Sequence, residues 1–204
     1  MLESKQLAAQ RGTATLFSGI DFKLAPGDAL LVTGANGSGK TTLLRTAAGL
    51  SHATEGTLSW RGVPVAPLDP DLRAAVTYIG HAAALKDELT AEENLASLAS
   101  LHDGSATSDA IGAALALWSL ERQRALPARA LSMGQRRRIG LARLALVPRP
   151  LWILDEPAAA LDTAGVALLC DMIGMHLAQG GMAIIATHQD IALSGPSVRG
   201  LSLS

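Results

Sequence analysis

The sequence GANGSGKT at residues 34–41 decides the fold class of this chain of 204 residues. It fits the pattern G-x-x-x-x-G-K-[ST], in which glycines let backbone N–H groups turn towards phosphate oxygens. The apolar residues 29–33 precede it as a buried strand, and residues 42–50 follow as a helix whose positive end faces the same anion. A glycine-rich turn can match by chance, but this strand and helix are the context that a phosphate-binding loop requires.

The loop supplies the first group of candidate site residues. Lys40 is expected to reach the β- and γ-phosphates as a catalytic residue, and the Thr41 hydroxyl to bind Mg²⁺. The full set expected to bind the phosphates of ATP is Gly34, Ala35, Asn36, Gly37, Ser38, Gly39, Lys40, Thr41 and Thr42.

Outward from the loop, strands and helices alternate. Further strands are predicted at residues 16–24, 56–60, 76–79, 151–154 and 182–187, and a helix at 164–178. Alternation of this kind favours a mostly parallel sheet with right-handed crossovers, so the expected fold is α/β. The early strands are expected to form an antiparallel β edge.

A helical pattern interrupts this alternation between Thr90 and Leu126. Residues 103–105 (Asp-Gly-Ser) divide it and Pro127 closes it. We interpret residues 90–130 as a helical subdomain inserted in one nucleotide-binding domain that spans residues 1–204.

Composition excludes several classes of protein. The longest apolar runs are far shorter than the roughly 18–20 residues that cross a bilayer, and the first residues lack the pattern of a secretory signal. We therefore expect no direct membrane insertion. Lysine and arginine total 17 against 18 acidic residues, which disfavours a nucleic-acid partner. The single cysteine, Cys170, lies in a helical pattern and is expected to be a buried thiol in a reducing cytoplasm rather than a reactive one.

Two acids end the apolar strand at residues 151–154. Asp155 is expected to hold Mg²⁺, directly or through water, and Glu156 to polarise the water that attacks the γ-phosphate. The alternative is that both acids cap the next helix.

The sequence LSMGQ at residues 131–135 precedes a helix that carries Ile139, Ala142 and Leu146 on one face. Here the chain resembles the ABC ATPase family of P-loop NTPases, whose signature reads LSGGQ. Met133 replaces the first glycine of that signature. Ser132 would be the N-cap of the helix, and its hydroxyl and the Gly134 N–H could face an anion.

The resemblance implies the rest of the site. In the family the signature, here Ser132, Gly134 and Gln135, contacts the γ-phosphate held by the opposite subunit, so a homodimer is implied. Asp162, in the sequence Ala-Leu-Asp, is similar to the family's D-loop, which crosses the dimer interface, and the resemblance implies that it contacts the nucleotide. His188 is similar to the switch histidine that contacts the γ-phosphate, and we assign it a catalytic role beside Glu156.

Two positions depart from the family pattern. His81 stands where the family usually has a glutamine that touches Mg²⁺, so a ligand role for it makes activity depend on pH. The family often has an aromatic residue that stacks on adenine just upstream of the strand near Ile20. None stands there in this chain, and Arg11 is the nearest residue that could stack on the base. The run Arg136–Arg138 could be a nucleic-acid patch, but the near-neutral charge favours a solvated helix face with salt bridges.

Several short segments resemble the ATP-binding subunit of the bacterial haem exporter of cytochrome c maturation. They are residues 15–19, Gly80-His81 followed by Lys86 and 89–95, Arg136–Arg138 and 141–144. This resemblance implies haem-handling integral-membrane permease subunits, a peripheral place on the cytoplasmic face of the inner membrane, and release of a haem-loaded chaperone. The segment 82–89 would transmit closure of the dimer to the membrane partner.

Three other functions stay open at this point. The chain could serve another small-molecule ABC transporter. It could be a soluble ABC ATPase acting on DNA or ribosomes, but it lacks sustained heptads and a second cassette. It could also bind nucleotide as a switch without hydrolysis, against which Lys40, Asp155, Glu156 and His188 all stand.

Overall fold

A computed structural model describes residues 1–101, 106–188, 191, 193 and 197–203. The chain divides into two compact units. The first comprises residues 1–78, 149–156 and 170–204, and the second comprises 79–148 and 157–169.

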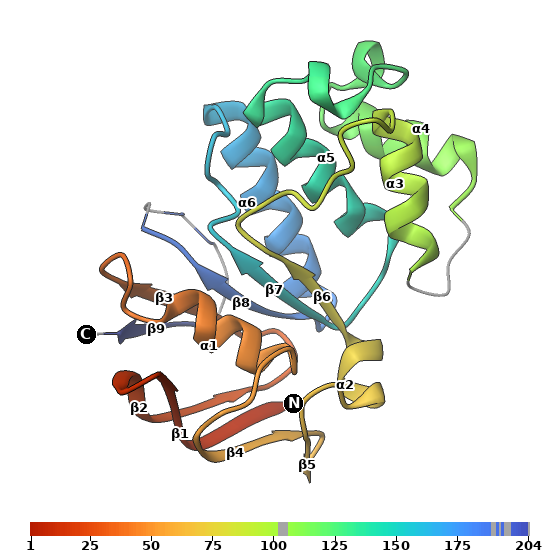
Figure 1. Cartoon of the computed structure of the whole chain (residues 1–204). Helices are drawn as coiled ribbons and strands as arrows, with labels where there is room; N and C mark the ends of the chain where they lie inside the picture. The colour runs from red at the N-terminus through yellow and green to blue at the C-terminus, as the bar shows by residue number, and fades with distance from the viewer. Residues whose placement is uncertain (102–105, 189–190, 192, 194–196, 204) are drawn as a thin grey trace. The chain divides into compact units, whose positions relative to one another are not determined.

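The first unit is built on two sheets (Figure 1). One is five-stranded with the order β6-β7-β8-β3-β9, in which β3 pairs in parallel with β8 and β9, and β7 with β8. Its strands are β3 (Ala29–Gly34), β6 (Val76–Ile79), β7 (Leu151–Asp155), β8 (Met182–Ala186) and β9 (Val198–Leu203). Every residue of β7 and β8 is buried, as strands of a parallel sheet require.

The second sheet of this unit is antiparallel, with the order β2-β1-β4-β5. Its strands are β1 (Leu2–Arg11), β2 (Ala14–Leu24), β4 (Glu55–Trp60) and β5 (Val63–Pro64). Helix α1 (Lys40–Ala47) shares one apolar core with both sheets, to which it contributes Leu43 and Leu44. This core fixes the helix that follows the phosphate loop. A short helix α2 (Pro70–Ala75), capped by the Asp69 side chain, leads into β6.

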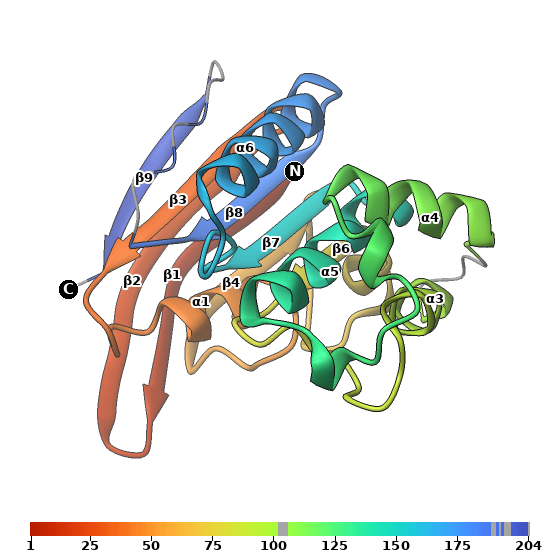
Figure 2. The ribbon, with the colours of Figure 1, turned by 90° about the horizontal axis from the view of Figure 1, so that it is seen from above.

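The second unit is helical (Figure 2). Its elements are α3 (Ala91–Ser100), α4 (Ser108–Leu117), the 3-10 turns η1 (Glu121–Gln123) and η2 (Ala128–Ala130), α5 (Met133–Leu146) and the start of α6 (Thr163–Ala178). Thr90 begins α3 with a capping box that Glu93 completes. Among the residues that the structure describes, no helix combines the length and apolar character needed to cross a membrane.

Asn94 of α3 organises the loop that precedes this helix. It is 2% exposed, its amide nitrogen donates to the carbonyls of Lys86, Leu89 and Thr90, and its amide oxygen accepts from the Lys86 N–H. One side chain therefore fixes the end of the segment 82–89 against α3.

The structure confirms the α/β fold with a mostly parallel sheet and an antiparallel β edge. The predicted strands are present, and α1 begins at Lys40 rather than at residue 42. Sequence patterns did not predict β1, β5, α2 and β9. The predicted break at 103–105 lies outside the described residues, and a single domain over 1–204 with a helical subdomain at 90–130 stays a prediction.

A stacked ring pair packs α6 on β7 inside the first unit. The rings of Trp152 and His176 lie 3.9 Å apart between centroids, at an interplanar angle of 3°. His176 Nε2 donates to the Met182 carbonyl at 3.2 Å. Burial lowers the pKa of His176 below its ordinary value of 6.5, although the Met182 carbonyl opposes the shift.

Acidification is therefore expected to destabilise the fold through His176. A histidine whose pKa is lowered by folding contributes stability fully above its unfolded pKa of about 6.5, and this contribution is lost as the pH falls through the folded pKa. The midpoint of urea unfolding should fall more steeply between about pH 7.5 and 5 in the parent chain than in His176→Phe, which keeps a ring on Trp152 but does not titrate. Parallel pH profiles for the two chains would contradict this assignment.

Candidate nucleotide site

The phosphate loop runs from β3 into α1 and depends on glycine at its two ends. Gly34 has φ 144° and Gly39 has φ 94°, values that L residues with side chains rarely adopt. A Cβ on Gly34 would meet the Leu203 carbonyl oxygen and the Ser38 hydroxyl, and a Cβ on Gly39 would lie 3.1 Å from Leu16 and Phe17. The tight path of the loop therefore requires these glycines.

Lys40 and Ser38 give this loop the groups that bind an anion. Lys40 is 7% exposed, and its ammonium donates to the carbonyls of Gly34 at 2.7 Å and Ala35 at 3.0 Å. Within the described part of the chain, the buried Ser38 hydroxyl oxygen has no hydrogen-bond partner. A polar hydroxyl buried in this way fits a loop that closes on a phosphate. Asn36 and Gly37 are exposed at its tip, and Thr42 is half-buried in α1.

Thr41 and Asp155 meet at the carboxyl edge of the parallel sheet. The Thr41 hydroxyl donates to Asp155 Oδ2 at 2.7 Å, although 114 positions separate the two residues. Asp155 ends β7 and is 1% exposed. A hydroxyl and a carboxylate are hard oxygen donors of the kind that Mg²⁺ prefers, so the residues present fit this ion.

Glu156 and His188 form a second pair in the same unit. His188 Nδ1 donates to Glu156 Oε2 at 2.8 Å, and the Glu156 side chain is 12% exposed. Glu156 has φ 49°, and its N–H donates to the Ala186 carbonyl of β8 at 2.9 Å. This left-handed backbone turns Glu156 away from the strand direction of Asp155, and such strain is often stored at functional sites.

Tyr78 is a neighbour of this site that sequence analysis missed. It lies in β6 and is half-buried. Burial raises the pKa of Tyr78, and the negative charge of Asp155 raises it further. The phenol therefore stays neutral beside the acids. Its place in a strand that neighbours β7 was the available signal.

In the second unit, the signature begins α5. The Ser132 hydroxyl accepts from the Gln135 N–H at 3.2 Å, and Gln135 Oε1 accepts from the Ser132 N–H at 2.9 Å, which completes a capping box. Ser132 is exposed, so its O–H can still donate. A Cβ on Gly134 would lie 2.7 Å from the Ala160 carbonyl oxygen, which explains glycine there.

The exposed carboxylate of Asp162 has two hydrogen-bond partners within the second unit. It accepts from the Gly165 N–H at 2.9 Å, and Arg138 donates to both of its carboxylate oxygens at 2.7 and 2.8 Å. The Gly165 N–H and then Arg138 lower the pKa of Asp162. These contacts keep Asp162 ionised and oriented. Its predicted contact with nucleotide stays a prediction.

The arginine run has different roles at each position. Arg136 pairs with Asp87 at 2.6 Å and Arg138 pairs with Asp162, as expected for salt bridges. Arg137 is 4% exposed, so the expected solvated face is wrong for this residue. Its partners include the backbone carbonyls of Pro157, Gly80 and His81.

His81 and Arg11 are both exposed. His81 belongs to the second unit, whereas Thr41 and Asp155 belong to the first. Arg11 ends β1 and pairs in register with Ala14 across the hairpin. Metal binding by His81 and base stacking by Arg11 stay predictions.

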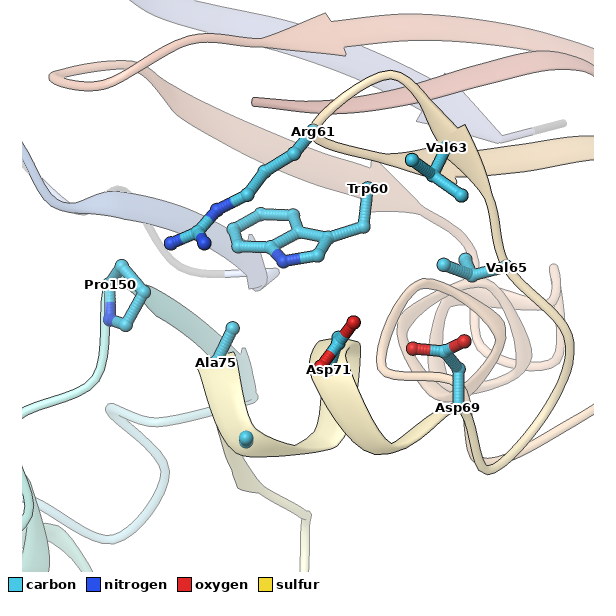
Figure 3. Close-up of a pocket in the computed structure, with 9 residues that line it drawn as sticks. Trp60, Arg61, Val63, Val65, Asp69, Asp71, Ala75 and Pro150 are labelled. Carbon is cyan, nitrogen blue, oxygen red and sulfur yellow. The ribbon is translucent and has the colours of Figure 1, made fainter.

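A separate pocket in the first unit has a volume of about 410 Å³ (Figure 3). Arg61 lies over Trp60 there, with its guanidinium carbon 5.4 Å from the ring centroid. The pocket is lined by residues in or next to β4, β5 and α2 and by Pro150, whereas the residues of this unit predicted to contact phosphate and Mg²⁺ lie at the ends of β3, β7 and β8 or at the start of α1. It is therefore not the nucleotide site.

The fold and the phosphate loop define the chain as a P-loop NTPase. A family model described as ABC transporter matches residues 17–159. The cytochrome c biogenesis ATP-binding export protein CcmA of Cupriavidus necator is 50% identical over 188 residues, which cover 92% of this chain and 83% of that protein. The protein of the same name from Nitrosomonas europaea is 44% identical over 204 residues, 100% of this chain and 96% of the relative.

A solved ABC transporter ATP-binding protein from Pyrococcus furiosus has the same fold, with a TM-score of 0.84 at 24% identity over 98% of this chain and 96% of that one. The chain belongs to the ABC transporter family, as an ATP-binding and ATP-hydrolysing cassette. Within that family its relatives are the ATP-binding export proteins of cytochrome c biogenesis.

Proposed function

We propose that this chain hydrolyses ATP to drive an export complex of cytochrome c biogenesis, with Glu156 as the general base. The observation that carries the chemical part is the pairing of Glu156 with His188 directly after the buried strands β7 and β8, one residue beyond the contact between Asp155 and Thr41. The export role is supported by relatives that are 44–50% identical over nearly the whole chain.

The residues of the first unit divide the work of hydrolysis. The glycine-rich loop and Lys40 bind the phosphates, and Lys40 offsets their charge. Thr41 and Asp155 would hold Mg²⁺, which supplies further positive charge to the β- and γ-phosphates when it is bound. Glu156 polarises the attacking water, and His188 orients Glu156 and the γ-phosphate. Most of the rate enhancement then comes from positioning and charge stabilisation.

The second unit completes the site from another copy of the chain. Ser132 and Gly134 begin a helix of 14 residues, and the exposed Ser132 can donate to an anion at its positive end. In a head-to-tail homodimer, these groups contact the γ-phosphate bound by the partner's loop. Hydrolysis then removes that contact and lets the dimer open.

Export requires partners that cross the membrane. We infer integral-membrane permease subunits that handle haem, with this chain peripheral on the cytoplasmic face of the inner membrane. The segment 82–89 is the proposed contact, and Asn94 holds its end against α3.

A gene deletion tests the export role in the native host. Loss of the chain should abolish covalently bound haem in c-type cytochromes on haem-stained gels while total haem persists. The parent gene should restore it, and the Glu156→Gln gene should not. Purification from crosslinked membranes should recover haem-handling permease subunits. Normal c-type cytochromes in the deletion strain, or recovery of an unrelated permease, would reject this branch and leave the ATPase activity standing.

A further inference from the structure

Arg137 is a buried cation on the helix that follows the signature. It is 4% exposed, although Arg136 and Arg138 on either side of it form partly exposed ion pairs. A buried guanidinium is costly unless its N–H groups are hydrogen-bonded. Its place inside the unit therefore depends on the acceptors around it.

The acceptors of Arg137 include backbone carbonyls from two distant loops of the same unit. Nε donates to the Pro157 carbonyl at 3.1 Å, and Nη1 donates to the carbonyls of Gly80 at 2.8 Å and His81 at 3.3 Å. The donors of a guanidinium form a rigid planar fork. One side chain thus fixes both loops relative to α5.

One loop borders the proposed general base, and the other begins the segment proposed to contact the membrane partner. Pro157 follows Glu156 directly in the chain, and Gly80-His81 begins the segment 82–89. Gly140 lies one turn further along α5, and a Cβ added to it would lie 3.5–3.7 Å from atoms of Ala83. The same helix therefore also packs close to the next part of that segment. Arg137 therefore joins the signature helix to both loops.

We propose that Arg137 is a positioning residue that couples the loop at 80–89 to the placement of Glu156. Its fork holds Pro157 and Gly80-His81 in one arrangement with α5, so a displacement of the loop moves the backbone next to Glu156. The part concerning Glu156 rests on the proposed function. The link between the loop and α5 does not.

The test compares purified full-length Arg137→Met, Arg137→Lys and Arg122→Met chains with the parent. Methionine keeps much of the length of the side chain without its donors, and lysine keeps the charge and part of the donors. Arg122 is the control, an exposed arginine of η1 in the same unit and outside both loops. Three quantities are measured: the dissociation constant for ATP, kcat per ATP-binding site, and amide hydrogen exchange in peptides covering residues 80–90 with and without Mg-ATP.

For Arg137→Met we expect kcat per binding site to fall at least about ten-fold, because small displacements of reacting groups are costly, while the dissociation constant stays within about three-fold. Exchange in 80–90 should be faster and should lose its response to Mg-ATP. Arg137→Lys should recover part of both effects, and Arg122→Met should keep kcat within about two-fold of the parent.

An unchanged kcat per binding site, or a parent-like response of 80–90 to Mg-ATP, would overturn the coupling. A loss of ATP binding in proportion to kcat would show a structural role only, and would overturn it as well. If Glu156→Gln keeps its turnover, the role of Glu156 fails, and the exchange data still decide whether Arg137 links the loop to nucleotide binding.

Discussion

Glu156→Gln is expected to lower kcat for ATP at least about hundred-fold and to leave the dissociation constant for ATP within about three-fold, because general-base catalysis typically contributes a factor of 10²–10⁴. Glutamine keeps the size of the side chain and an oxygen that can accept from His188 Nδ1, as Glu156 does at 2.8 Å. Glutamine has no negative charge, so it cannot polarise the attacking water or accept its proton as a carboxylate can. Single-turnover kinetics measure the rate of hydrolysis and calorimetry measures the dissociation constant for ATP, so the two effects can be separated.

Glu55→Gln is the matched control for this substitution. Glu55 is an exposed carboxylate of β4 in the same unit, so its change removes one charge without touching the site. If Glu55→Gln keeps the turnover of the parent and Glu156→Gln loses it, the loss is caused by removing the carboxylate at position 156 and not by removing one negative charge from the unit. Turnover retained in Glu156→Gln would show that another group activates the water.

The core of the fold was predictable because its strands are short apolar runs next to distinctive loops. Residues 29–33, 151–154 and 182–187 are almost wholly apolar, as strands buried on both faces must be. Strand β1 was missed for the opposite reason. Its register shifts at three places and Gln6 has φ 50°, so apolar residues do not alternate regularly along it.

The site was predictable where a motif prescribes chemistry, as with the contact between Thr41 and Asp155. Arg137 and Asn94 were missed because they look like ordinary polar residues of a helix. Periodicity held a signal: Arg137 precedes Leu141 and Leu144 by four and seven positions, and Asn94 lies three after Ala91 and four before Leu98. A polar residue at a buried-face position needs hydrogen-bond partners, and backbone carbonyls of remote loops cannot be read from local sequence.

Mixing two inactive variants should restore ATP hydrolysis if the site is shared between copies of the chain. Lys40→Met removes the ammonium that contacts the loop carbonyls. Ser132→Asp keeps an N-cap for α5 but places a negative charge where the γ-phosphate of the partner is expected. A homodimer of either variant carries its defect in both sites, so no site combines an intact loop with an intact signature. We therefore expect hydrolysis at background level for each variant alone.

A mixed dimer of these two chains has one site with both defects and one site with neither. Random pairing of equal amounts makes about half of the dimers mixed, so independent sites predict about a quarter of the parent activity per chain. Activity should be measured after the chains have exchanged partners. The control mixes Lys40→Met with a double variant that carries both Lys40→Met and Ser132→Asp. No chain in that mixture has an intact loop, so it should restore no hydrolysis. If the mixture stays at background while crosslinking shows that mixed dimers form, loop and signature act within one chain, and the head-to-tail dimer is wrong.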